Sequence, residues 1–188
     1  MTKIYMVRHG EAAAHWSEDR DPGLSTVGRE QAEKVAENLK DLGPLPILTS
    51  PLQRTRETAL PFERQWKLHA AVEPAITEIP TPDIAMDQRG PWLMEVMGGS
   101  WADHASQPVA NGTLGEWREQ LIGRMLTITE DTLMTSHFIA INVAVGWALG
   151  NDALITFKPD NASCTVLEVI DGQLSLISLG EEAQTKVG

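Results

Sequence analysis

Short apolar runs alternate along the chain with segments whose apolar residues recur every three to four positions. Lys3–Val7, Leu45–Thr49 and Thr132–Ser136 have the length and composition of strands, and a segment with helical spacing comes after each of them. Strands that alternate with helices pair in parallel, because the helix returns the chain to the end of the sheet where the previous strand began. The alternation therefore predicts an α/β protein with a mostly parallel sheet.

Residues that favour helix ends mark the limits of the first two helices. Ser25 or Thr26 can cap a helix that Gly43-Pro44 ends. Ser50-Pro51 supplies a cap and then a proline at the first helical position, which predicts the start of a second helix. Pro61 is expected to break or restart this second helix, because proline lacks the backbone N–H that a helix interior needs.

The remaining predicted elements complete the sheet and its covering layers. They are a weak strand at Ala70–Glu73, an amphipathic helix from Glu116 to about Ile128, a buried helix at Phe138–Leu149, and two alternating strands, Ala162–Ile170 and Gln173–Leu179. Asp171-Gly172 separates these last two strands and is a strong signal for a tight turn. The sheet is therefore expected to end in a C-terminal β-hairpin.

Regular periodicity is absent between about residues 74 and 115, where prolines and glycines are frequent. A long irregular segment in a compact domain is usually functional, so we expect a lid-like insertion here. Trp92 and Trp101 lie in this segment, where they line a substrate pocket or pack the loop itself. Trp66, Trp117 and Trp147 fall in helical patterns and are predicted to belong to the core.

Length, charge and cysteine content limit the binding partners and the cellular compartment that we expect for this chain. The chain has 188 residues and a formal net charge of −11, which favours one domain and disfavours nucleic acid or an anionic membrane surface as a partner. Its apolar runs are too short for a signal peptide or a membrane span. The single Cys164 excludes an intrachain disulfide and fits a reducing compartment. We therefore expect a cytoplasmic protein.

Basic side chains follow three of the predicted strands. Arg8-His9, Ser50–Arg54 and His137 each come directly after a strand, and ligands of such sheets bind beyond the carboxyl ends of the strands. Two arginines and two histidines should therefore meet at one edge of the sheet. No carboxylates and histidines cluster there at metal-ligand spacing, so neither a metal nor another cofactor is expected.

Two guanidiniums beside two imidazoles suit a phosphoryl group. Arginine presents paired donors that match phosphate oxygens, and a helix that starts at Pro51 would add partial positive charge beside Arg54. One neutral histidine can attack phosphorus and form a phosphohistidine, while the other donates a hydrogen bond to the phosphoryl oxygens. Neighbouring cations lower the pKa of a histidine and so keep the nucleophile unprotonated.

Four ordered motifs carry a family resemblance. Arg8–Glu11 after an N-terminal strand, Leu24–Gly28 at the start of a helix, Ser50–Ala59, and Ser136-His137 together resemble the histidine phosphatase superfamily, which includes the cofactor-dependent phosphoglycerate mutases. Glu11–Ala13 and Asp21–Leu24 are also similar to the small bacterial phosphohistidine phosphatase branch. The resemblance covers essentially the whole chain. It implies a single domain, residues 1–188, with a three-layer α/β/α fold and a mixed sheet.

The resemblance also implies roles for particular residues. It makes His9 the nucleophile and Arg8, Arg54 and His137 the phosphate pocket, and Glu78 matches the position where many members carry the proton donor. Asp83 and Asp87 are the fallback candidates for that donor. Two positions depart from the family pattern. They are His15, which stands where many members place a phosphate-contacting asparagine and is expected at the substrate-binding rim, and Phe138, which replaces a usual glycine and would narrow the pocket.

These observations predict a metal-independent phosphomonoester phosphatase. The alternatives are a phosphoglycerate mutase, which returns the phosphoryl group to a second hydroxyl, and a catalytically silent module that binds a phosphorylated ligand. Between Glu73 and Arg118 the only Lys or Arg is Arg89, which favours phosphatase over mutase, because a mutase must hold a second anionic group. The partner is a small phosphorylated metabolite or a phosphohistidine protein. The sequence leaves the substrate and the oligomeric state open.

Overall fold

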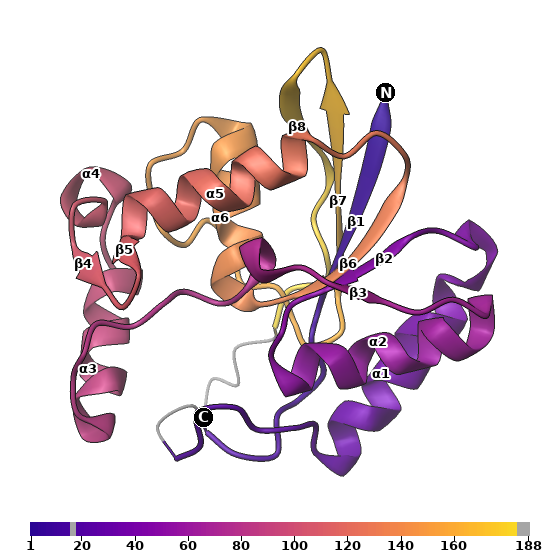
Figure 1. The fold of residues 1–188 in the computed structure, drawn as a ribbon, viewed down its shortest axis with the longest axis horizontal. Coiled ribbons are helices and arrows are strands. Elements are labelled where there is room, and N and C mark those ends of the chain that lie inside the picture. The colour runs from indigo at the N-terminus through magenta and orange to yellow at the C-terminus, as the bar shows by residue number, and fades with distance from the viewer. Residues whose placement is uncertain (16–17, 184–188) are drawn as a thin grey trace.

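A six-stranded sheet forms the centre of the molecule, in the strand order β3-β2-β6-β1-β7-β8. The computed structural model describes residues 1–15 and 18–183. The strands of this sheet are β1 (Thr2–Arg8), β2 (Ile47–Thr49), β3 (Ala71–Val72), β6 (Thr132–Ser136), β7 (Cys164–Ile170) and β8 (Gln173–Ser178). Figure 1 shows helices on both faces of the sheet. The predicted three-layer α/β/α architecture is confirmed.

The sheet is mixed. β3, β2, β6 and β1 pair in parallel, whereas β7 pairs antiparallel with both β1 and β8. The turn between β7 and β8 places Asp171 and Gly172 at positive φ, as a tight hairpin turn requires. The mostly parallel sheet and the C-terminal hairpin are therefore both confirmed.

Alternation of side chains along β1 divides the core into two layers. Tyr5 and Val7 face α1 (Thr26–Asn38) and α2 (Gln53–Trp66), whereas Ile4 and Met6 face α5 (Leu114–Leu126) and α6 (Phe138–Leu149). In Figure 1, α1 and α2 lie together on one side of the sheet and α5 and α6 on the other. Trp66 and Trp117 belong to this core as predicted, but the prediction for Trp147 is wrong, because it is 40% exposed on α6.

The second helix differs from its prediction in where it begins and in the effect of Pro61. α2 begins at Gln53, two residues after Pro51, and its start is held by Asp21 Oδ1, which accepts a 2.7 Å hydrogen bond from the Gln53 N–H. Pro61 lies inside α2 and does not break it. An interior proline costs about 3 kcal/mol. Burial of Ala59 and Phe62, both completely inaccessible, offsets that cost.

The segment between residues 74 and 115 is more regular than predicted. It contains short turns and strands and one 12-residue helix, α3. Its elements are η2 (Pro74–Ile76), α3 (Met86–Met97), α4 (Trp101–His104), β4 (Pro108–Val109) and β5 (Gly112–Thr113). Gly90 and Pro91 suggested an irregular loop, but α3 continues through both and buries Val96 in the core. Trp101 packs against Trp117 of α5, so it is a core residue of this segment.

One further short helix, η1 (Lys40–Leu42), follows α1. Among the described residues, no helix combines the length and the apolar character that a membrane crossing needs.

Candidate active site

The carboxyl ends of three parallel strands bring the predicted site residues together. In the register of the sheet, Arg8 at the end of β1 lies opposite Ser136 of β6, and Thr49 of β2 lies opposite Thr135 of β6. His9, Ser50 and His137 are the next residues of these three strands. They therefore lie side by side at one edge of the sheet, as the sequence predicts.

His9 is buried, and two hydrogen bonds fix its protonation. Its Nδ1 lies 2.7 Å from the carbonyl oxygen of Gly10, which can only accept, so Nδ1 carries the proton. Its Nε2 accepts a 3.2 Å hydrogen bond from Arg54 Nε. Burial, and then the charges of Arg54 and Arg8, lower the pKa of His9 to about 3. The ring is therefore neutral at physiological pH, with a lone pair on Nε2.

The loop that carries His9 is held tightly against the start of α1. A Cβ atom on Gly10 would collide with the backbone of Gly28, and a Cβ atom on Gly28 would collide with the carbonyl oxygen of Glu11. The Gly10 N–H also donates a 3.1 Å hydrogen bond to Thr58 Oγ1. Neither glycine can be replaced without moving the backbone, so the position of His9 is rigidly defined.

The two arginines approach His9 from different elements. Arg54 lies in the first turn of α2 and is 4% exposed, and its Nη1 is a buried atom with no hydrogen-bond partner among the described residues. Arg8 Nη1 donates a 2.9 Å hydrogen bond to the Pro159 carbonyl, and its guanidinium lies 5.1 Å from the centre of the Phe138 ring. Arg8 Nε is a second buried donor without a partner in the described part of the chain.

The His137 ring packs against the ring of His9. It is fully buried, and the two imidazole rings meet edge to face with their centres 5.3 Å apart. Ser50 Oγ lies 2.7 Å from His137 Nε2. If this hydroxyl donates, the ring proton sits on Nδ1, which is buried and has no acceptor among the described residues. Burial, and then His9 and the two arginines, lower the pKa of His137 well below its ordinary value.

Glu78 faces the cationic cluster from the amino end of α6. Its Oε1 accepts hydrogen bonds from the backbone N–H groups of Ile79, Ile139 and Ala140, at 3.0, 3.2 and 3.3 Å. Burial raises the pKa of Glu78, while these backbone donors and the charges of Arg54 and Arg8 act in the opposite direction. The raised pKa favours the protonated acid that a proton donor needs.

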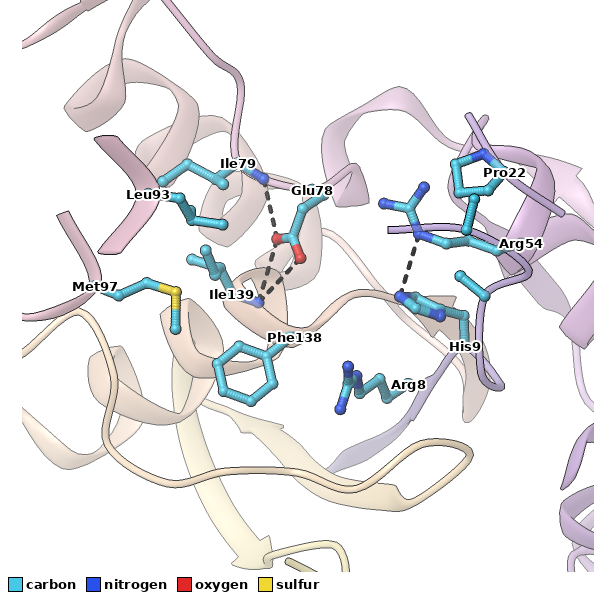
Figure 2. Close-up of a pocket in the computed structure, with 12 residues that line it drawn as sticks. Arg8, His9, Pro22, Arg54, Glu78, Ile79, Leu93, Met97, Phe138 and Ile139 are labelled. Carbon is cyan, nitrogen blue, oxygen red and sulfur yellow. Dashed lines mark hydrogen bonds between the residues drawn. The ribbon is translucent and has the colours of Figure 1, made fainter. Parts of the chain in front are cut away.

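A cavity of about 350 Å³ joins Arg8, His9, Arg54 and Glu78, and Figure 2 shows its lining, to which the fully buried His137 does not belong. The lining residues are Arg8, His9, Ala12, Ala14, Pro22, Arg54, Glu78, Ile79, Leu93, Met97, Phe138 and Ile139. Phe138 forms part of the wall. Asp83 and Asp87, the fallback acids, are exposed and do not line the cavity.

His15 lies beside this cavity and does not line it. Its side chain is exposed and lines an adjoining cavity of about 450 Å³, which also touches Arg8 and His9 but not Glu78. Within the described ranges, no group of three or more His, Cys, Asp or Glu side chains is arranged to hold a metal ion.

Sequence reasoning missed Ser50, Asn161 and two apolar residues of α3. Ser50 was assigned to a helix cap, but its hydroxyl contacts His137; its position after a strand, beside Thr49, was the available signal. Leu93 and Met97 lie in the 74–115 segment, which the sequence predicts to be irregular. Their four-residue spacing, which fits one face of a helix, was the available signal. Asn161, whose Nδ2 donates a 3.1 Å hydrogen bond to the His9 carbonyl, left no signal in the sequence.

The family of the chain follows from its match to a family model. Residues 4–182 match the model of the histidine phosphatase superfamily (branch 1). The chain therefore belongs to this superfamily, as its motifs suggested.

Relatives and solved structures are consistent with this membership. A protein named probable phosphoglycerate mutase GpmB, from Erwinia tasmaniensis, is 26% identical over 200 residues, which cover 98% of this chain and 92% of that protein. The fold resembles a mycobacterial glucosyl-3-phosphoglycerate phosphatase solved with inorganic phosphate (TM-score 0.75, 18% identity, 97% of this chain and 98% of that one). It also resembles a phosphoserine phosphatase from Entamoeba histolytica solved with phosphoserine (TM-score 0.73, 19% identity, 96% and 98%).

Proposed function

We propose that this protein is a phosphomonoester phosphatase that acts through a phosphohistidine on His9. One observation carries the proposal. Two buried nitrogens, Arg8 Nε and Arg54 Nη1, lack partners among the described residues, and both belong to arginines that line the cavity beside the His9 lone pair. Buried donors are nearly always hydrogen-bonded, so their convergence calls for a ligand with several acceptor oxygens. A phosphoryl group has that geometry.

In the first step, His9 Nε2 attacks phosphorus and the bond between phosphorus and the ester oxygen breaks. The Arg54 Nε–H group, which donates a hydrogen bond to His9 Nε2 in the free enzyme, donates instead to a phosphoryl oxygen. This change of acceptor frees the lone pair on His9 Nε2. Arg8, Arg54 and His137 hold the negative charge that develops on the phosphoryl oxygens. Glu78, in its protonated form, gives its proton to the departing alkoxide.

In the second step, water attacks the phosphohistidine. The Glu78 carboxylate formed in the first step accepts a proton from that water, and the bond between phosphorus and His9 Nε2 breaks. Inorganic phosphate leaves, and His9 and Glu78 return to their starting forms. Residues 1–188 act as one domain in this proposal, and the 74–115 segment covers the site as its lid.

Phosphatase activity is favoured over mutase activity by the charges of the pocket. A mutase holds a substrate with a second anionic group, yet Arg8 and Arg54 are the only cations among the described lining residues. The intact set of Arg8, His9, Arg54 and His137 also disfavours a silent binding module. Phosphoglycerate interconversion that outpaces phosphate release would favour the mutase.

A rapid-quench experiment tests the covalent step. The enzyme is mixed with p-nitrophenyl phosphate, quenched without acid to preserve a phosphohistidine, digested and analysed by mass spectrometry. The phosphoryl group is expected on the peptide that contains His9, and His9→Asn should abolish both the adduct and turnover. His69→Asn is the matched control, because His69 is an exposed histidine away from the site. An active enzyme that carries phosphate on another residue, or on none, would contradict the mechanism.

A further inference from the structure

The candidate pocket has two chemically different ends. Arg8, His9 and Arg54 form a cationic end and Ile79, Leu93, Met97 and Ile139 an apolar end, while the Phe138 ring lies between them, 5.1 Å from the Arg8 guanidinium. Figure 2 shows the two ends on opposite sides of the Glu78 carboxyl group. The phosphoryl group belongs at the cationic end. Because the proton donor must face the leaving oxygen, the rest of the substrate extends past Glu78 toward the apolar end.

Two backbone donors at the apolar end are already occupied. The N–H groups of Ile79 and Ile139 line that end, and both donate to Glu78 Oε1. A leaving group rich in hydroxyls would lose its water there without gaining hydrogen bonds, which costs about 1–3 kcal/mol for each unsatisfied polar group. A hydrocarbon leaving group pays no such cost and is stabilised by burial.

The charges of the pocket disfavour a second anionic group. Among the described lining residues, Arg8 and Arg54 carry the positive charge, and both face the phosphoryl position. The next ionisable group along the pocket is Glu78, an acid. A second anion on the substrate would therefore pass a carboxyl group and end among leucine, methionine and isoleucine side chains.

We infer that the substrate is a phosphomonoester of an uncharged, largely apolar alcohol, with an alkyl or aryl leaving group. Leu93 and Met97, four residues apart on α3, are the residues that select it. This inference rests on the proposed phosphatase function and adds the class of substrate to it. The adjoining cavity beside His15 does not receive the leaving group, because Glu78 does not line it.

Two arginines outside the pocket, Arg20 and Arg89, could favour a substrate with a second anionic group. Burial and the nearby charge of Arg20 lower the pKa of Arg89 on α3, so these two arginines lie near each other although neither lines the pocket. A substrate long enough to reach them with a second anion would reverse the expected selectivity. 3-Phosphoglycerate is therefore included among the test compounds.

The test compares kcat/KM across primary alkyl phosphates from ethyl to hexyl, whose leaving alcohols have nearly equal basicity. For the wild-type chain we expect kcat/KM to rise by about fourfold for each buried methylene, the equivalent of about 0.8 kcal/mol. Glucose 6-phosphate and 3-phosphoglycerate should both be poorer substrates than hexyl phosphate. A flat or falling series, or a preference for either comparison compound, would overturn the inference.

Substitutions on α3 identify the residues that select the leaving group. Met97→Gln keeps the side-chain length but adds a polar end, and should reduce the hexyl-to-ethyl ratio of kcat/KM by about tenfold. Met94→Gln is the matched control on the same helix, because Met94 is 71% exposed and should leave the ratio unchanged. Leu93→Asn provides a second variant if Met97→Gln does not fold. An unchanged ratio in a folded Met97→Gln or Leu93→Asn protein would show that α3 does not select the substrate.

The same experiment separates the two proposals. If p-nitrophenyl phosphate and ethyl phosphate are hydrolysed but chain length has no effect, the substrate class is wrong and the phosphatase function stands. If none of the esters releases phosphate, both proposals are wrong.

Discussion

Arg54 Nε donates its hydrogen bond to His9 Nε2, the atom whose lone pair would attack phosphorus. The contact has two effects. The positive charge of Arg54 adds to burial in keeping the imidazole neutral, and the guanidinium occupies the position that phosphorus must approach. In the proposed mechanism, Arg54 therefore shields His9 Nε2 until phosphoryl oxygens accept hydrogen bonds from the guanidinium.

Removal of the Arg54 charge should raise the pKa of His9. The pKa of about 3 results first from burial and then from Arg54 and Arg8, so Arg54→Gln removes one of the causes that lower it. The midpoint of the His9 titration should move to higher pH in this variant, whereas Arg54→Lys, which keeps a cation, should move it less. NMR titration of ring-labelled histidine measures both. Equal midpoints in the wild type and in Arg54→Gln would show that this charge does not tune His9.

The two buried histidines should make the protein less stable as the pH falls. Their folded-state pKa values lie below the ordinary value of 6.5, so the unfolded chain binds more protons than the folded chain below that pH. Each should lower the free energy of unfolding by about 1.4 kcal/mol per pH unit between pH 6 and pH 5. Glu78 acts in the opposite direction, because its pKa is raised by folding.

Urea denaturation at pH 6 and pH 5 measures this dependence. His9→Asn and His137→Asn should each reduce the fall in the free energy of unfolding between the two pH values, whatever their effect on stability at pH 7. A dependence as steep as in the wild type would mean that the histidine concerned is protonated in the folded protein.

Glu78→Gln should discriminate between leaving groups. Glutamine retains an oxygen that can accept from the Ile79 and Ile139 N–H groups, so the backbone arrangement is preserved while the proton is lost. An alkoxide leaves poorly without a proton, and a positioned acid typically contributes 10²–10⁴-fold. Turnover of ethyl phosphate should fall by about that factor, but turnover of p-nitrophenyl phosphate much less. Similar losses for the two esters would remove Glu78 from the role of acid.

Ser50→Ala should disturb His137 through its ring proton. The Ser50 hydroxyl lies 2.7 Å from His137 Nε2, and if it donates to that nitrogen it favours the tautomer with the proton on Nδ1. Loss of one buried hydrogen bond is worth about 1–1.5 kcal/mol, so kcat should fall by about tenfold. ¹⁵N shifts of the ring should show mixed tautomers. Thr49→Val is the control, because the Thr49 hydroxyl donates to the Ser50 carbonyl and not to His137. A single unchanged tautomer in Ser50→Ala would refute the positioning role of Ser50.

Much of the fold could be predicted because the strands and helices that form the sheet are regular in sequence. Thr132–Ser136 and Phe138–Leu149 have the predicted bounds, since an apolar run followed by His137 marks both elements. The meeting of Arg8, His9, Arg54 and His137 was also predictable, because parallel strands end at one edge. Their chemical roles remain a proposal.

The features that the sequence did not predict depend on contacts between residues far apart in the chain. Pro61 and Pro91 lie inside helices whose apolar faces pack against the protein, and the residues they pack against lie elsewhere in the chain. The apolar side of the pocket has the same origin. Leu93 and Met97 line the cavity only because the segment after η2 and the start of α6 bring Ile79 and Ile139 to the same part of it.

The backbone contact between Gly10 and Gly28 fixes one wall of the pocket, because not even a methyl group fits between the His9 loop and the first turn of α1. The opposite wall of the pocket is formed in part by side chains of α3. These side chains can be substituted without moving the backbone at Gly10 and Gly28. The loop that carries His9 is thus constrained by backbone packing, whereas the pocket side chains of α3 are free to vary. Over evolution, we expect relatives of this chain to have acquired new leaving-group preferences by substitution on α3, while the nucleophile and its cations stayed in place.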